Sequence, residues 1–178
     1  DIVPQGLKAL PAELVSIFPP GPISFKPAEE DLNMKIVFSK QPFTKKHNLI
    51  TNTKNFMHMV SAIYFTKTQT GVADAKPEKE KINPSKVSAS DDSTEWFLMF
   101  TKDKFEPNYD YKFNLDSNYL YDSNYSTFKI ATNLKLPIIR VETDRETIFN
   151  IVDGVKGNDK INKSEMKPEE KQITPLAL

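Results

Sequence analysis

Histidine is the side chain that most often acts as a general base or metal ligand near neutral pH. This sequence of 178 residues contains only two, His47 and His58. His47 follows two lysines in a polar stretch, and their charges disfavour an imidazolium cation. His58 lies in an apolar run, where we expect it to be buried with one satisfied hydrogen bond. No nucleophile signature such as Gly-x-Ser-x-Gly accompanies either histidine. The pattern favours a non-enzymatic protein, and a hydrolase whose site assembles only in space is an alternative.

A tandem Asp-Ser-Asn-Tyr repeat is the most distinctive local feature of the chain, with copies that begin at Asp116 and Asp122. Asp and Asn side chains stabilise turns through local hydrogen bonds, so we expect both copies in turns or loops. Tyrosine rings flanked by amides and carboxylates are also typical of adaptable recognition surfaces. The candidate ligand- or partner-binding residues are therefore Asp116, Asn118, Tyr119, Tyr121, Asp122, Asn124 and Tyr125.

This segment has three interpretations that the sequence leaves open. Sugars stack on tyrosine rings while amides and carboxylates bind their hydroxyl groups, which would make 109–125 the centre of a carbohydrate-binding module. Asp116 and Asp122, with the neighbouring amides, would instead offer oxygen ligands to calcium. The third interpretation is structural: a polar connection whose tyrosine rings cover the edge of the core.

Other metal and cofactor sites are excluded by residue type and spacing. The chain has no cysteine, so disulfides, zinc–thiolate sites and thiol nucleophiles are absent. Its five glycines are too scattered to form a phosphate-binding loop. The stretch 153–165 resembles a calcium loop, but its spacing places Lys156 at a ligand position, where the charge repels the ion. We therefore predict no cofactor and no bound metal.

The charge balance restricts the class of partner. The chain carries 24 basic and 24 acidic residues, a net charge of zero, so it has no general attraction for nucleic acid. No apolar run approaches the ~18 residues that a membrane-spanning helix needs. Little charge repulsion opposes association, which favours a protein partner. Hydrophobic residues make up only 38% of the chain, and the deficit falls in 71–93 and 153–178.

Short segments rich in aromatic, β-branched and alternating apolar residues recur through the rest of the chain and predict strands. Two of them are apolar on both faces and are expected to be covered on both, and the only tryptophan, Trp96, is expected in the core. One segment alternates cleanly and is expected to face the core on one side and water on the other. The predicted strands are 33–39, 56–66 and 94–101 (the last two apolar on both faces), 109–115 (alternating), 127–132, and a hairpin of 137–143 with 147–152.

These strands, without a convincing long helix between them, predict an all-β fold. We expect a single antiparallel β-sandwich, immunoglobulin-like or of a related Greek-key topology, over residues 23–152. The polar segment at about 74–93 is expected to be a long mobile loop, and 153–178 a polar flexible tail or linker.

The first 22 residues are predicted to form a proline-rich extended arm, because proline removes backbone donors and restricts the residue before it. One short helix is expected within the arm at 11–18, where Leu14, Val15 and Phe18 share a helical face.

The function predicted from these features is that of a non-enzymatic protein-binding or scaffold domain in an extracytoplasmic assembly of the cell envelope, secretion machinery or surface. Such a domain would pair a strand edge or an exposed apolar patch with its partner. Because the chain begins at Asp1 without a methionine, we expect a leader or preceding domain to have been removed. Tethering through a missing terminal segment fits the flexible ends.

Overall fold

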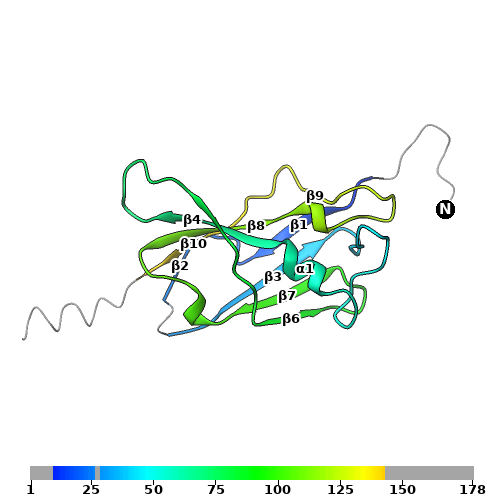
Figure 1. Ribbon diagram of the computed structural model, residues 1–178, viewed down its shortest axis with the longest axis horizontal. Helices are drawn as coiled ribbons and strands as arrows, with labels where there is room; N and C mark the ends of the chain where they lie inside the picture. Colours follow the sequence, from blue (N-terminus) through cyan, green and yellow to red (C-terminus); the bar gives the residue numbers. More distant parts are fainter. Residues whose placement is uncertain (1–9, 27–28, 143–178) are drawn as a thin grey trace, which may run out of the picture. The chain divides into compact units, whose positions relative to one another are not determined.

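The computed structural model describes residues 10–26 and 29–142, which consist mainly of strands (Figure 1). The all-β prediction is confirmed. One short α-helix is present, and the predicted strand 147–152 and tail 153–178 lie outside the described residues. The elements are β1 (Glu13–Phe18), β2 (Ile23–Phe25), β3 (Leu32–Phe38), α1 (Met57–Ala62), β4 (Ile63–Gln69), β5 (Glu78–Glu80), β6 (Lys86–Ala89), β7 (Glu95–Phe100), η1 (Lys102–Lys104), β8 (Tyr109–Leu115), η2 (Ser117–Tyr119), β9 (Lys129–Ile130) and β10 (Ile138–Val141).

The strands form two five-stranded sheets. Sheet A has the order β6-β7-β3-β1-β9, and sheet B has the order β2-β10-β8-β4-β5. The expectation of purely antiparallel pairing is wrong at two places, because β1 pairs with β9 and β2 pairs with β10 in parallel. Both sheets are therefore mixed, and a single sandwich of immunoglobulin-like or related Greek-key topology stays a prediction.

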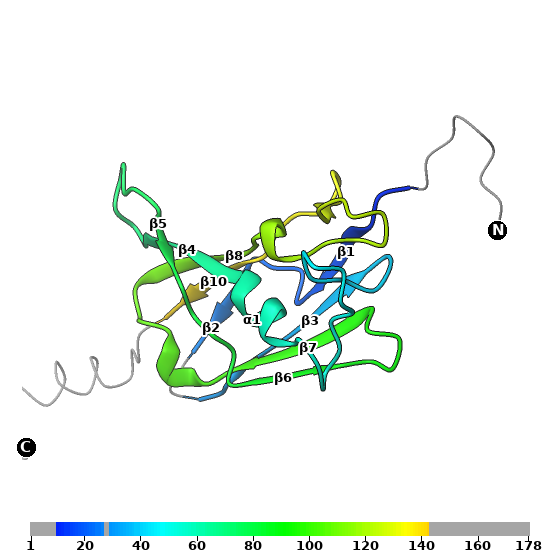
Figure 2. The ribbon, with the colours of Figure 1, turned by 45° about the vertical axis from the view of Figure 1, so that its right-hand side comes forward.

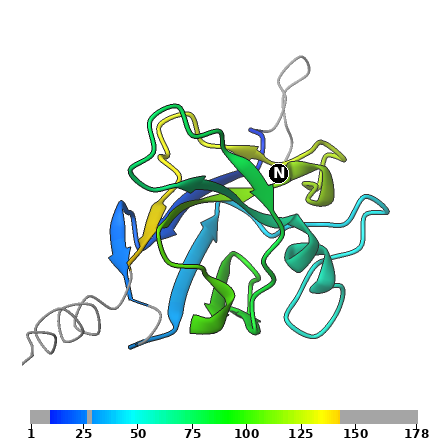
Figure 3. The same ribbon diagram turned by 60° about the vertical axis from the view of Figure 1, so that its left-hand side comes forward.

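The two parallel pairs arise because two chain segments change sheets side by side. The first passes from β1 in sheet A to β2 in sheet B through 19–22, and the second passes from β9 to β10. Figures 2 and 3 show β2 and β10 next to each other at the end of these crossings. Gly21 lies in the first crossing with φ +47°, and a Cβ there would meet the Cβ of Pro137 at 2.9 Å. The close approach of the two crossings therefore requires glycine at this position.

Both sheets contribute their inward side chains to one hydrophobic cluster. Trp96 is fully buried there, as predicted, and its Nε1–H donates to the carbonyl oxygen of Ser93 at 2.8 Å. The ring of Phe65 in β4 lies 5.4 Å from that of Phe100 in β7, so aromatic contacts join the two sheets. In β8 the predicted alternation is confirmed, since Tyr111 and its inward neighbours are buried while the intervening side chains are not.

The predicted helix at 11–18 is wrong, because this segment is strand β1. Leu14 and Ile17 are both buried although they are three residues apart, which looks like helical spacing. A β-bulge between Leu14 and Ser16 produces this spacing, because it inserts one extra residue and shifts which side chains face the core. Residues 13–18 are thus part of sheet A rather than of an arm, and the folded domain begins before residue 23.

The strand predicted at 56–66 is half wrong. Its first part is helix α1, and only the part from Ile63 onward is strand β4. An apolar run of this length suits a short buried helix as well as a central strand, so the periodicity did not distinguish them. Met59, Val60 and Ala62 bury the inner side of the helix.

The segment 74–93 is not one long loop, because it contains β5 and β6. Each of these strands lies at the border of its sheet. A border strand pairs on one side only and exposes most of its side chains, so its polar composition resembles that of a loop.

Candidate functional site

The two copies of the Asp-Ser-Asn-Tyr repeat form the same local turn. In the first, the Asp116 Oδ1 accepts the N–H of Asn118 at 3.0 Å, and in the second the Asp122 Oδ1 accepts the N–H of Asn124 at 2.8 Å. The tyrosine N–H that closes each copy donates to the aspartate carbonyl oxygen, at 3.2 Å and 3.1 Å respectively. The prediction that both copies lie in turns held by local hydrogen bonds is confirmed.

The second copy is anchored in the interior, whereas the first is not. Asp122 is only 2% exposed, and its Oδ1 also accepts the N–H of Ser126 at 3.0 Å. Its Oδ2 accepts the N–H of Ala12 at 3.4 Å. Both oxygens of this carboxylate therefore serve backbone donors. No group of three or more His, Asp or Glu side chains within 10–26 and 29–142 is arranged to hold a metal ion.

The three tyrosines of the repeat region differ in exposure. Tyr121 is half-buried and bridges to Phe43 and Thr127 through its backbone, while Tyr119 and Tyr125 are exposed. No ring contact within the described part of the chain joins any two of these tyrosines. Asn118 and Asn124 project from the turns into solvent. The seven candidate residues thus share two neighbouring turns but do not form one aromatic surface.

His47 forms an aromatic stack that the sequence did not predict. Its imidazole lies 3.9 Å from the ring of Tyr125 at an interplanar angle of 17°, and 4.7 Å from the ring of Phe43 at 10°. Both His47 and Tyr125 have left-handed backbone conformations, with φ of 66° and 64°. The His47 Nδ1 is buried and has no hydrogen-bond partner within the described residues. The stack therefore holds the Tyr125 ring at the surface from one side.

His58 lies half-buried in α1 rather than in the predicted strand. Within 10–26 and 29–142, no hydrogen bond joins either histidine side chain to a carboxylate or hydroxyl group. A His-based hydrolase needs such a junction in a cleft. That alternative therefore gains no support from the described residues.

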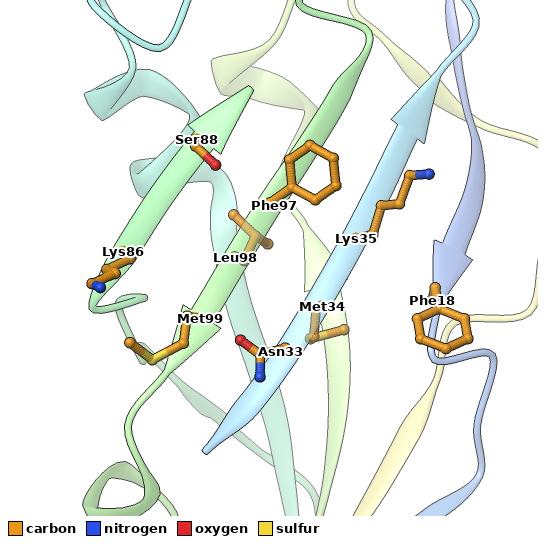
Figure 4. Close-up of a pocket in the computed structure, with 9 residues that line it drawn as sticks. All are labelled: Phe18, Asn33, Met34, Lys35, Lys86, Ser88, Phe97, Leu98 and Met99. Carbon is orange, nitrogen blue, oxygen red and sulfur yellow. The ribbon is translucent and has the colours of Figure 1, made fainter. Parts of the chain in front are cut away.

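The outer face of sheet A carries a groove that the sequence did not predict (Figure 4). Its volume is about 440 Å³, and side chains of β1, β3, β7 and β6 line it. We call it the sheet A groove. One rung of paired residues crosses the four strands with its side chains on this face: Phe18, Lys35, Phe97 and Ser88.

Phe18, Phe97 and Met99 supply exposed apolar surface in the sheet A groove. Phe18 is 63% exposed on β1 and Phe97 is 42% exposed on β7, with Met99 beside Phe97. Lys35 of β3 lies between the two phenylalanines, and its Nζ lies 3.3 Å from a carboxylate oxygen of Glu95 and 5.8 Å from the centre of the Phe97 ring. The arrangement suits a ligand with both apolar surface and negative charge.

Lys86 occupies the β6 side of the sheet A groove. It has no ion pair among the residues that the structure describes. Lys35, by contrast, shares its charge with Glu95. The β6 side of the groove is therefore the more positive one.

The outer face of sheet B has a different character. A groove of about 390 Å³ crosses it, and two of its polar side chains, Asn114 and Thr66, are hydrogen-bonded to each other at 3.0 Å. Arg140 donates from Nε and a terminal nitrogen to Asp110 at 3.0 Å and 3.3 Å, and Thr70 donates to the same carboxylate at 3.0 Å. The hydrogen bond from Arg140 holds the pKa of Asp110 below its usual value, against the opposing effect of partial burial. The Asp110 carboxylate on this face is therefore satisfied within the domain.

No protein-family model matches this chain, and no curated protein matches its sequence. No helix within the described residues is long and apolar enough to cross a membrane. The geometry of the described domain therefore carries the functional argument.

The sequence contains one indication of an apolar outer face on sheet A, although it predicted a covered face rather than a groove. The segment 94–101 is apolar on both faces and was expected to be covered on both. Trp96, Leu98 and Phe100 are buried in the core, but the opposite face of β7 is open in the described domain, with Phe97 exposed. Strand β7 thus carries apolar side chains on both faces, but within the described domain only its inner face is covered.

Proposed function

We propose that this domain is a non-enzymatic protein-binding domain of an extracytoplasmic assembly, and that it binds its partner through the sheet A groove. The observation that supports this proposal is the exposure of two aromatic side chains, Phe18 and Phe97, on the outer face of sheet A. Burying one such side chain contributes about 1.5–3 kcal/mol. Exposed apolar side chains that cluster with polar residues on one face are typical of interaction surfaces.

The contrast between the two outer faces supports a protein partner for sheet A rather than for sheet B. Aromatic anchors surrounded by charged rim residues are typical of the energetic centres of protein interfaces. Phe97 and Phe18 would be the anchors, with Lys35 between them and Lys86 on the β6 side. On the outer face of sheet B, by contrast, Arg140 is already paired with Asp110.

Affinity capture from the source organism with matched variants tests this proposal. Phe97→Ser and Phe18→Ser remove the anchors, and Ile138→Ser is the control, because Ile138 lies on the outer face of sheet B and is 40% exposed. We expect the wild type and the control to capture the same partner and the two anchor variants to lose it. Capture of that partner by the double anchor variant would overturn the proposal, as would the absence of any partner for the wild type.

The location is tested separately. Cell fractionation, followed by detection of the native chain with an antibody, should place it outside the cytoplasm. Recovery of the chain only with cytoplasmic markers would contradict this part of the proposal and leave the groove as a binding surface inside the cell.

Carbohydrate binding is the second candidate, and the exposed ring of Tyr125 favours it. Tyr125 is 68% exposed, and its stack on His47 occupies only one face of the ring. A presented aromatic face with an exposed amide at Asn124 suits a sugar ring. A glycan array read with the wild type and Tyr125→Ala tests this function. A binding signal that the substitution abolishes supports carbohydrate binding, and the absence of any signal for the wild type contradicts it.

A further inference from the structure

The border strand β6 offers backbone groups to a partner. It is the outermost strand of sheet A, and Figures 1 and 2 show it at the margin of the ribbon. Its register with β7 pairs Ser88 with Phe97, and the N–H of Ser90 continues the ladder by donating to Glu95 at 2.9 Å. In an antiparallel pair the backbone groups alternate in direction, so Val87 and Ala89 direct their N–H and C=O groups away from β7.

The four border strands of the described sheets are not equally protected. β6 has four residues, whereas β2 and β5 have three each and β9 has two. β5 reads Glu-Lys-Glu and is charged throughout, which discourages the addition of another strand. β6 reads Lys-Val-Ser-Ala and carries one charge. It is the longest of the four border strands and less charged than β5.

The side chains of β6 specify what an added strand must carry. Lys86 and Ser88 face the sheet A groove, while Val87 and Ala89 pack against the core from the other face. Side chains directly opposite each other in neighbouring strands lie ~5 Å apart, and opposite charges there attract. A carboxylate would therefore lie opposite Lys86, and apolar residues would lie beside Val87 and Ala89.

We propose that β6 takes up an extended segment of the partner protein as an added strand, and that this segment alternates carboxylate and apolar side chains. The inference rests on the proposed protein-binding function and names the partner's chemistry and mode of docking. The added strand would continue sheet A and extend the surface around Phe97. A second copy of this chain fits less well, because its own β6 brings another Lys86 and no carboxylate.

Binding of a capped synthetic peptide that alternates glutamate and valine tests the inference, with a lysine–valine peptide as the control. Amide NMR of the full chain should show slowed hydrogen exchange at Val87 and Ala89 with the glutamate peptide. Lys86→Glu should weaken binding of the glutamate peptide about five-fold and strengthen binding of the lysine peptide. Lys129→Glu, in the border strand β9, is the matched control and should change neither affinity.

Three outcomes would overturn strand addition. They are no slowing of amide hydrogen exchange at Val87 and Ala89, equal affinity of the wild type for both peptides, or no reversal of the peptide preference in Lys86→Glu. Self-association that Val87→Pro abolishes would assign the strand to a second copy and would also overturn it. A captured partner that is lost with Phe97→Ser but retained with Lys86→Glu would leave the protein-binding function intact and reject this mode of docking.

Discussion

The Asp122 carboxylate accepts a hydrogen bond from the N–H of Ala12, 110 residues earlier in the chain, at 3.4 Å in the buried interior. This bond joins the second Asp-Ser-Asn-Tyr turn to the residue that precedes β1. The carbonyl oxygen of Ala12 in turn accepts the N–H of Lys129 at 3.1 Å, next to the parallel pairing of β1 with β9. The second copy of the repeat is therefore part of the framework that holds this side of sheet A.

The two copies of the repeat should respond differently to the same substitution. Asp122→Ala leaves three N–H groups without their acceptor, that of Ala12 in a buried setting and those of Asn124 and Ser126 in a partly buried one, and we expect it to lower the free energy of unfolding by about 3 kcal/mol. Asp116→Ala removes one exposed bond and should lower it by less than about 1 kcal/mol. Urea unfolding followed by Trp96 fluorescence measures both. Equal losses would contradict the structural role of Asp122.

Lys81 fastens helix α1 to the segment between β5 and β6. Its Nζ donates to the carbonyl oxygens of Val60, Ser61 and Ile63 at the carboxyl end of the helix. Burial lowers the pKa of Lys81 below its ordinary value, and nearby Lys79 adds to the effect. The ammonium group is thus partly desolvated, and the hydrogen bonds to its three acceptors offset the cost of that desolvation.

Replacing Lys81 with methionine keeps the length of the side chain and removes its donors. We expect Lys81→Met to lower the free energy of unfolding by about 1–3 kcal/mol and to speed amide exchange in α1. Lys79→Met is the matched control, because Lys79 is exposed on β5 and its Nζ lies over the ring of Tyr64 rather than on the carbonyl groups of α1. Its effect should stay within about 0.5 kcal/mol. Similar losses for both variants would refute the fastening role.

Sequence patterns predicted those strands whose neighbours are regular. The alternation at 109–115 identified β8 within its observed bounds, and Trp96 was placed correctly in the core. The same approach failed at β1, where Leu14, Val15 and Phe18 were assigned to one helical face, whereas Val15 and Phe18 are exposed and a bulge buries Leu14 with Ile17. A bulge depends on the partner strand, which is distant in sequence and therefore invisible to a local pattern.

The candidate sites show the same limit. The turns at Asp116 and Asp122 were predictable because their hydrogen bonds are local. The stack of His47 on Tyr125 joins residues 78 positions apart, counting 125 − 47, and no local signal indicates it. The sheet A groove was partly visible, since 94–101 is apolar on both faces, but only the fold shows which face stays open.

The pair of Asp110 and Arg140 on the outer face of sheet B should make stability sensitive to acid. The hydrogen bond and charge of Arg140 hold the pKa of Asp110 below its unfolded value, so the folded state binds fewer protons than the unfolded state in acid. The contribution is thus fully present above the unfolded pKa of about 3.9 and is lost as pH falls through the lowered pKa.

Asp110→Asn should therefore lower the free energy of unfolding at neutral pH by up to about 1 kcal/mol, because Arg140 is more than half exposed and the pair is screened by solvent. The difference from the wild type should shrink as the pH falls from about 4 through the lowered pKa, below which the carboxylate of the folded wild type is itself protonated. In an Arg140→Gln background the same substitution should have a smaller effect, because the main cause of the pKa shift is absent. Urea unfolding across this pH range measures all four proteins of the cycle. A loss for Asp110→Asn that does not change with pH would mean that Asp110 acts through packing or its bond with Thr70 rather than through its charge.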